Sequence, residues 1–289
     1  MGSMRAAADE LGLAPSSVSR QISRLEADLD IDLVKQGTHR ISLTKAGEAV
    51  IEYYRSRLSQ QEALLNRLDE LRGHYMSSTI IAVGEGLLGT NSISDLQDFL
   101  RNNPGIHTEI VTAPSLEVQR MILEDTAHIG VVFSPPTNPT LRKVYSFPQP
   151  LRAIVHPKSK LAKRTQVTIE DLVQYPLVLP GPKFRVRTLI DAAGRDHGIT
   201  IRPNITSNSL QVILDCVRSN IAITLLAELP IFSELQAGTF KSIPVDCLAM
   251  NTTDIQIVVR ESRKLSPLSR DLIKHLARTI NRLCRSVPI

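Results

Sequence analysis

The segment RAAADELGLAPSSVSRQISRLE, residues 5–26, restricts what this chain can form more than any other feature. Its alanines favour a helix, Gly12 suits a helix stop in the left-handed region, and Pro15 suits the first turn of a second helix. Apolar residues of the second helix recur at helical spacing: Val18, Ile22, Leu25 and Leu29. The pattern predicts two short helices that meet at a tight turn, the second with a buried apolar stripe.

The opposite face of the second helix carries small hydroxyl side chains and arginines. They are Ser16, Ser17, Ser19, Arg20, Ser23 and Arg24. A helix that enters the major groove of DNA needs short side chains for close approach and arginines for guanine edges or phosphates. The alternative is that Ser16 caps the helix and that the arginines form a solvated face.

The segment LVKQGTHRISLTKAGEAV, residues 33–50, has the form of a short two-stranded wing, after which Thr44 caps a new helix. The order of two short helices, a wing and a long helix strongly resembles the winged helix-turn-helix end of LysR-type transcriptional regulators, a bacterial family. The matching residues are Arg5-Ala6-Ala7, Leu11, Ser19-Arg20-Gln21-Ile22, Leu25-Glu26, Leu33, Arg40, Leu43-Thr44 and Ala46-Gly47.

The resemblance implies that the second helix binds double-stranded promoter DNA. The predicted DNA-binding residues are Pro15, Ser16, Ser17, Ser19, Arg20 and Arg24, together with Arg40, which would reach the minor groove or the backbone from the wing. Family members begin with a further helix, and only residues 1–4 precede the first helix here. The helix that opens other family members is therefore expected to be absent here. Its absence would expose Val18, Ile22 and Leu25 and weaken the domain.

A long helix is predicted from Thr44 to Leu71 because apolar residues recur in it at heptad-like spacing. The stripe consists of Ile51, Tyr54, Leu58, Leu65 and Leu68. A single helix cannot bury this stripe alone, so we expect an antiparallel helix pair between two copies of the chain; packing against its own domain is the alternative. The predicted domains are 1–44 for DNA binding, 45–77 for the linker helix and hinge, and 78–289 for effector binding.

Beyond the hinge, short apolar strands alternate with helices, a pattern typical of parallel α/β sheets. The predicted strands are 79–83, 107–111, 129–133, 151–156, 177–179, 201–205, 221–226 and 255–259, and the predicted helices are 93–100, 116–123, 186–193 and 267–283. The last strand and helix return to the first half, giving lobe I at about 78–151 and 257–289 and lobe II at about 152–256. The fold class is thus mixed, with an N-terminally incomplete α-rich winged helix-turn-helix followed by a two-lobed α/β domain. This domain resembles the periplasmic-binding-protein-like effector domain of the same family.

Ligands of such folds bind beyond the carboxyl ends of strands and near helix N-termini. The residues at those ends are Gly84, Glu85, Gly86, Ser115, Ser134, Thr206, Ser207, Asn208 and Thr224. Each also has a local interpretation, such as a cap for Ser115 and Ser207, a turn for Ser134 or a tight bend for the glycines. Together they form the predicted effector site.

The loop LPGPKFRVRTLI, residues 179–190, places Lys183, Arg185 and Arg187 near a predicted helix N-terminus, where an anionic effector could bind. A solvated basic loop or an oligomer contact is the alternative for each of them. Many effectors of the family are small carboxylates, which hydroxyl groups and free helix N–H groups suit. The resemblance therefore implies a small-molecule effector of this kind, bound between the lobes.

Several other classes of protein are disfavoured. No apolar run approaches the length of a membrane span, no export signal opens the chain, and Cys216, Cys247 and Cys284 lack paired spacing, so we expect a cytoplasmic protein without a membrane partner. The net charge of +5 gives no support to DNA binding, because the basic excess lies after residue 76. Ser115, His107 and Asp125 offer the residue types of a triad, but catalytic, phosphate-loop and metal motifs are missing, so we expect no enzyme, no cofactor and no metal.

The expected partners are promoter DNA, further copies of the chain as a dimer and tetramer, a small-molecule effector and RNA polymerase. The main interpretation is a LysR-type regulator whose promoter binding changes when the effector shifts the lobes. The alternative is a truncated relative that dimerises and binds effector without binding DNA tightly.

Overall fold

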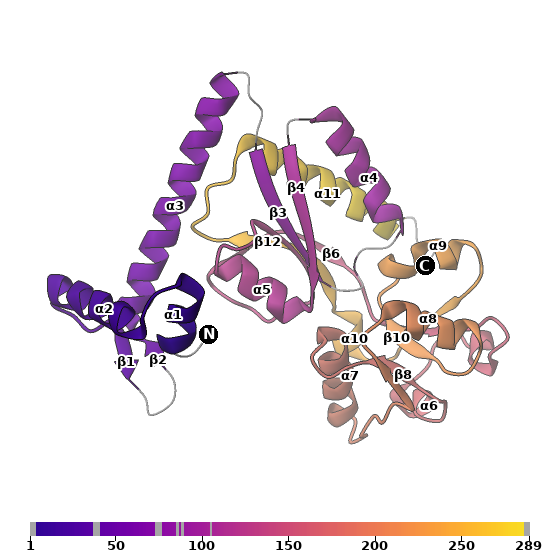
Figure 1. Cartoon of the computed structure of the whole chain (residues 1–289). Coiled ribbons are helices and arrows are strands. Elements are labelled where there is room, and N and C mark those ends of the chain that lie inside the picture. Colours follow the sequence, from indigo (N-terminus) through magenta and orange to yellow (C-terminus); the bar gives the residue numbers. More distant parts are fainter. Residues whose placement is uncertain are drawn as a thin grey trace. The chain divides into compact units, whose positions relative to one another are not determined.

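The computed structural model describes residues 4–36, 41–72, 77–84, 87, 90–104 and 106–285. The chain forms two compact units, Met1–Leu65 and Asn66–Ile289, and Figure 1 labels many of their elements. The boundary between the units lies inside the long helix α3 (Lys45–Leu71). Within the described ranges, no helix is both long enough and apolar enough to cross a membrane.

The N-terminal unit opens with helices α1 (Met4–Leu11) and α2 (Pro15–Leu29), as the sequence predicts. Gly12, between them, has a φ of 64°, a left-handed conformation that suits glycine. Pro15 is the first residue of α2, so Ser16 lies too late in the chain to be its N-cap. The alternative of a capping role for Ser16 is therefore wrong.

The apolar stripe of α2 is not buried, contrary to the sequence-based expectation. Val18 and Ile22 are half-buried, and Leu25 and Leu29 are 42% and 47% exposed. The reason is that α1 has eight residues and buries only Ala8, so it covers too little of α2. Within the described residues, this face of α2 is therefore left partly open to solvent.

The predicted wing is present as strands β1 (Val34–Gln36) and β2 (Ile41–Leu43), which pair in antiparallel fashion. Glu26, near the end of α2, fixes where the wing begins. Its Oε1 accepts hydrogen bonds from the backbone N–H groups of Leu33 at 2.8 Å and of the next residue at 3.1 Å. One carboxylate thus ties the second helix to the first strand of the wing.

Helix α3 begins next to the wing because of two residues of the LTKAG motif. Thr44 accepts a hydrogen bond from the N–H of Gly47 at 3.0 Å, which confirms the predicted cap, and its hydroxyl donates to the carbonyl of Asp32 at 2.7 Å. A Cβ at Gly47 would lie 2.1 Å from the carbonyl oxygen of Leu33. The backbones of the wing and of α3 therefore approach each other as closely as only glycine permits.

Replacing Gly47 by alanine is expected to destabilise the N-terminal unit by at least about 2 kcal/mol, because backbone rather than a flexible side chain must move. The matched control is Gly12→Ala, where no atom lies within 4 Å and only the positive φ opposes the side chain, at roughly 1 kcal/mol. Hydrogen exchange of the amides of residues 5–44, measured in the full chain, gives both values. Equal protection in the two variants would contradict the close approach.

Lobe I of the second unit contains one five-stranded sheet with the order β4-β3-β5-β12-β6. Its strands are β3 (Ser77–Gly84), β4 (Ile106–Ala113), β5 (Ile129–Phe133), β6 (Leu141–Pro148) and β12 (Asp254–Arg260). The strands β3, β4 and β5 run in parallel, whereas β12 is antiparallel to β5 and β6. The prediction of parallel strands therefore holds for β3, β4 and β5 but not for β12, which enters from the other lobe in the opposite direction. The sequence also does not predict β6.

Helices cover both faces of this sheet because successive side chains of a strand point to opposite sides. Ala82 of β3 belongs to the apolar cluster with α5 (Ser115–Leu123). Its neighbour Ile81 belongs to the cluster with α4 (Thr90–Asn102) and α11 (Pro267–Arg285). Strand alternation thus builds the three-layered core of lobe I (Figure 1).

Lobe II contains a three-stranded antiparallel sheet, β10-β7-β11, and a parallel pair, β8-β9, joined by a bridge between Leu177 and Ile223. The strands are β7 (Arg152–Val155), β8 (Val178–Pro180), β9 (Ile205–Ser207), β10 (Thr224–Leu226) and β11 (Lys241–Pro244). The helices are η1 (Lys160–Lys163), α6 (Ile169–Leu172), α7 (Arg185–Asp196), α8 (Leu210–Arg218), η2 (Leu229–Ile231), α9 (Phe232–Gln236) and α10 (Leu248–Asn251). Alternate residues of β7 pack toward α7 and α8, so this sheet is also covered on both faces.

Two strands of lobe II differ from the predicted ones. The strand predicted at 201–205 begins only at Ile205, because Pro203 lacks the N–H that a strand needs for pairing. The strand predicted at 221–226 is shortened to Thr224–Leu226. The sequence does not predict β11.

The chain crosses between the lobes twice, after β6 and before β12. The two crossing segments pair with each other through the backbone N–H of Gln149, which donates to the carbonyl of Thr253 at 2.9 Å, and that of Leu151, which donates to the carbonyl of Met250 at 2.9 Å. The predicted return boundary between residues 256 and 257 lies inside β12, all of which pairs within the sheet of lobe I. The two lobes thus share a double-stranded connection.

Candidate functional site

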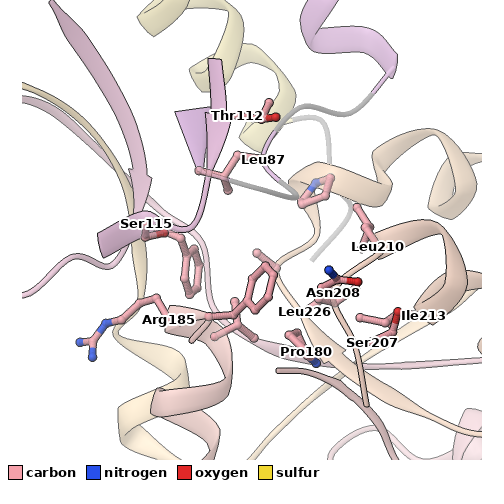
Figure 2. Close-up of a pocket in the computed structure, with 15 residues that line it drawn as sticks. Leu87, Thr112, Ser115, Pro180, Arg185, Ser207, Asn208, Leu210, Ile213 and Leu226 are labelled. Carbon is pink, nitrogen blue, oxygen red and sulfur yellow. The ribbon is translucent and has the colours of Figure 1, made fainter. Parts of the chain in front are cut away.

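A cavity of about 390 Å³ lies between the two lobes, in the size range of pockets for small ligands. Lobe I contributes Leu87, Thr112, Ser115 and Phe133, and lobe II contributes Pro180, Phe184, Arg185, Val186, Ser207, Asn208, Leu210, Ile213, Leu226, Ala227 and Pro230. Most of these side chains are apolar. The cavity therefore suits a ligand with an apolar body whose orientation a few polar groups determine (Figure 2).

Lobe I contributes two hydroxyl residues to the lining, Thr112 and Ser115, and Ser115 is the one that begins a helix. It is the first residue of α5, whose N-cap Pro114 offers no side-chain cap, so the predicted capping role of Ser115 is not observed. Ser115 is only 8% exposed, yet in the described part of the chain its hydroxyl has no hydrogen-bond partner. The first N–H groups of a helix also lack partners within the helix and favour anions. This corner of the cavity can therefore accept a negatively charged group.

Ser207 and Asn208 provide polar groups from lobe II, and Figure 2 shows them across the cavity from Ser115. Ser207 ends β9, and its Oγ accepts a hydrogen bond from the N–H of Ser209 at 3.1 Å. Ser209, rather than Ser207, is the N-cap of α8, since its hydroxyl accepts from the N–H of Val212 at 3.4 Å. The turn before α8 thus holds Asn208 at the cavity.

Arg185 is the charged residue among the described lining residues. Its Nε donates to the carbonyl of Ser134 at 2.7 Å, and its Nη1 donates to Thr188 at 3.4 Å. In Figure 2 the guanidinium points away from the other labelled side chains, so the stem of Arg185 lines the cavity while its head reaches the other lobe. Burial lowers the pKa of Arg185, but an arginine stays protonated at neutral pH. The head of Arg185 therefore joins the lobes and places its positive charge at the contact with Ser134, beside the cavity.

The other two basic residues of the predicted anion-binding loop do not line the cavity. Lys183 is exposed, and Arg187 forms an ion pair with Asp191 at 2.9 Å and donates to the carbonyl of Pro180 at 3.2 Å. The alternative of a solvated basic residue thus fits Lys183, whereas Arg187 is held within its own helix by Asp191.

Of the predicted effector-site residues, Ser115, Ser207 and Asn208 line the cavity, and four others lie elsewhere. Gly84 is buried beside Ser115, with a Cβ position 3.3 Å from its Oγ, and Ser134 contacts Arg185 from outside the lining. Thr206 is exposed, and Thr224 is fully buried in β10, because that strand lies between β7 and the Leu177 bridge. Glu85 and Gly86 lie outside the described residues.

Sequence reasoning missed Thr112 and the apolar wall of the cavity. Phe133 and Leu226 end buried strands, and Phe184 and Leu210 flank the starts of helices. Their positions at the ends of predicted strands and helices could have indicated that they line the cavity. Their residue types do not separate them from core residues, however, because both kinds of position select apolar side chains.

The polar face of α2 is available for contact. Ser16, Arg20 and Arg24 are exposed and follow one another at four-residue spacing, which places them on one face of the helix. Pro15 is also exposed, and Ser17 and Ser19 are half-buried. Arg40 lies outside the described residues. The described part of this unit thus presents hydroxyl and guanidinium groups together on one helix.

Family models match both units. The model described as a bacterial regulatory helix-turn-helix protein of the lysR family matches residues 1–48, and the LysR substrate binding domain matches residues 94–281. The chain belongs to the LysR family of transcriptional regulators. As a member, it is a transcriptional regulator whose partners are promoter DNA, further copies of itself and a small-molecule effector. No comparison supports the alternative of a truncated relative that does not bind DNA tightly.

Individual relatives agree with this assignment. The HTH-type transcriptional regulator CbbR of Rhodospirillum rubrum is 26% identical over 273 residues, which cover 93% of this chain and 89% of CbbR. The structure of full-length CbnR with its target DNA is 20% identical, with a TM-score of 0.55, and the match covers 96% of this chain and 94% of CbnR. The regulatory domain of Synechocystis PCC6803 CcmR in complex with 2-PG is 15% identical, with a TM-score of 0.61, covering 74% of this chain and all of that domain. The two structures have the same fold as this chain.

Proposed function

We propose that this regulator binds a small organic anion with an apolar body in the cavity between its lobes. Ser115 carries the proposal, because it is a buried hydroxyl without a partner among the described residues at the uncapped start of α5. A carboxylate there would accept hydrogen bonds from the hydroxyl and from helix N–H groups. Arg185 would add a favourable field, and the solved relative with 2-PG is consistent with a small anionic effector.

Effector binding acts by changing the distance between the lobes. A ligand that contacts Ser115 in lobe I and Asn208 in lobe II at the same time favours the closed arrangement of the two lobes. The ligand shifts the equilibrium only by its differential affinity for the two arrangements. This shift changes how the copies of the chain in one oligomer bind promoter DNA.

The DNA contacts are assigned to the exposed face of α2. Pro15, Ser16, Ser17, Ser19, Arg20 and Arg24 approach base edges and phosphates, and Arg40 contacts DNA from the wing. The apolar stripe of α3 joins two copies of the chain. A regulator that binds promoter DNA works where the chromosome lies, so we place the protein in the cytoplasm. To its cavity we assign ligand binding without catalysis or a cofactor.

The effector site predicts a difference between carboxylates and their amides. Small aromatic and alicyclic carboxylates, such as benzoate and shikimate, should include compounds that raise the melting temperature, whereas the matching amides should not. Ser115→Val should weaken a binding carboxylate roughly tenfold to a hundredfold, since one charge-assisted hydrogen bond is lost. Calorimetric titration of the full chain measures the effect.

Thr224→Val is the matched control, because Thr224 is a buried hydroxyl residue of lobe II outside the cavity. It should leave the affinity unchanged. Equal losses in both variants, or equal binding of acids and amides, would contradict the anion site at Ser115.

A further inference from the structure

Gln149 lies where the chain first crosses from lobe I to lobe II. It is only 4% exposed, and Thr253 on the returning segment is 3% exposed. In addition to the backbone hydrogen bond between these residues, the Thr253 hydroxyl donates to the carbonyl of Gln149 at 2.7 Å. The backbone of Gln149 therefore holds the two crossing segments together.

The side-chain amide of Gln149 bonds to both lobes. Its Oε1 accepts from the N–H of Leu229 in η2 at 3.1 Å, and its Nε2 donates to Sγ of Cys284 in α11 at 3.2 Å. Because a backbone N–H can only donate, the amide oxygen must face Leu229, which leaves the amide nitrogen for the thiol. The amide orientation is thus determined by its partners.

Of the two partners, Leu229 lies at a contact between the lobes, and Cys284 lies at the end of lobe I. Leu229 comes from lobe II, but its side chain is 3% exposed and lines a small apolar cavity with Leu96, Leu276 and Ile280 of lobe I. The next residue, Pro230, lines the effector cavity. Cys284 lies in the last turn of α11, and burial raises the pKa of its thiol to about 11, so this acceptor is uncharged at neutral pH. One amide thus connects the two crossing segments, the core of lobe I and, through η2, the wall of the cavity between the lobes.

We propose that Gln149 is the positioning residue that couples the two lobes into one cooperative unit. Removing its amide would leave the backbone of both crossing segments and the apolar packing of Leu229 in place, and would remove the hydrogen-bonded link between η2 and α11. The lobes would then open and unfold more independently. This inference goes beyond the proposed function, because it concerns the protein without an effector and does not depend on what the cavity binds.

The test compares the stability of each lobe in the full chain. The chain contains no tryptophan, so Tyr145→Trp in β6 and Tyr175→Trp in lobe II, introduced separately, give one fluorescent reporter for each lobe. With Gln149 intact, urea titration should give the same midpoint with either reporter, as expected for one cooperative transition. With Gln149→Met, which has similar size but no hydrogen-bonding amide, the two midpoints should separate by roughly 0.5 M urea or more.

Gln119→Met is the matched control, because Gln119 is also a buried glutamine, and it lies in α5 away from the crossing segments. Its two midpoints should remain equal. Cys284→Ala removes only the bond to lobe I and should give a smaller separation; it replaces Gln149→Met if that variant fails to fold. The proposal is overturned if both midpoints fall together in the Gln149 and Cys284 variants, or if they already differ with Gln149 intact.

Discussion

Replacing Leu58 and Leu65 together by arginine is expected to convert the protein to a monomer and to lower promoter affinity at least a hundredfold. The two leucines lie one heptad apart on α3 and are 44% and 52% exposed in the single chain. Tyr54 and Leu68 continue the exposed stripe. In the helix pair, the two arginines of each helix would face the two arginines of the partner. These charges would be buried without a partner of opposite charge, which is unfavourable.

Promoter affinity should fall because a monomer carries only one recognition helix. A dimer places two recognition helices on two half-sites, and the second contact is then intramolecular, which raises overall affinity by orders of magnitude without new contacts. Sedimentation gives the oligomeric state, and fluorescence anisotropy with a labelled promoter fragment gives the affinity.

Ser56→Arg with Gln60→Arg is the control, because it adds the same charge to the opposite face of α3. This variant should remain a dimer and keep its promoter affinity. If both double variants stay dimeric, the stripe packs within its own chain and the assigned interface is wrong.

Replacing Arg20 by methionine is expected to lower specific promoter affinity roughly tenfold to a hundredfold, because one good bidentate contact to a base discriminates by about 1–3 kcal/mol. Arg20 lies between Ser16 and Arg24 on the exposed face of α2. Methionine keeps most of the length of the side chain but removes the charge and all donors. Anisotropy titrations with the promoter and with unrelated DNA separate specific from general binding.

Arg101→Met removes the same charge from an exposed position of α4 in lobe I and serves as the control. It should leave both affinities within about twofold. A loss of binding to unrelated DNA equal to the loss at the promoter would assign Arg20 to phosphate contact rather than to base recognition. No loss at all would remove α2 from the interface.

The helices and the wing of the N-terminal unit could be predicted because their signals are local. Gly12 and Thr44 act on neighbouring residues, so a helix stop and a helix cap are visible in the sequence. The burial of the α2 stripe could not be predicted in this way, because it depends on which other elements cover Leu25 and Leu29. Periodicity identifies a face and does not say what packs against it.

The sequence predicted only part of the polar lining of the cavity between the lobes, and it did not predict Thr112 or the apolar wall. Ser115 and Asn208 follow strand ends, where the topology of such sheets places ligands. Arg185 and Arg187 have the same residue type and nearly the same place in the chain, yet one reaches the carbonyl of Ser134 across the lobes and the other pairs with Asp191 on its own helix. Only the tertiary arrangement separates them, and the same holds for the apolar wall.

The most direct test of the regulator model is an anisotropy titration of the full chain on its own promoter region, across a salt series, with and without a carboxylate that raises its melting temperature. The account predicts tighter binding to one promoter segment than to unrelated DNA and a steep decrease with salt. It also predicts a change of at least about fivefold when the carboxylate is present. Equal binding to all DNA, or an affinity that the bound carboxylate leaves unchanged, would contradict it.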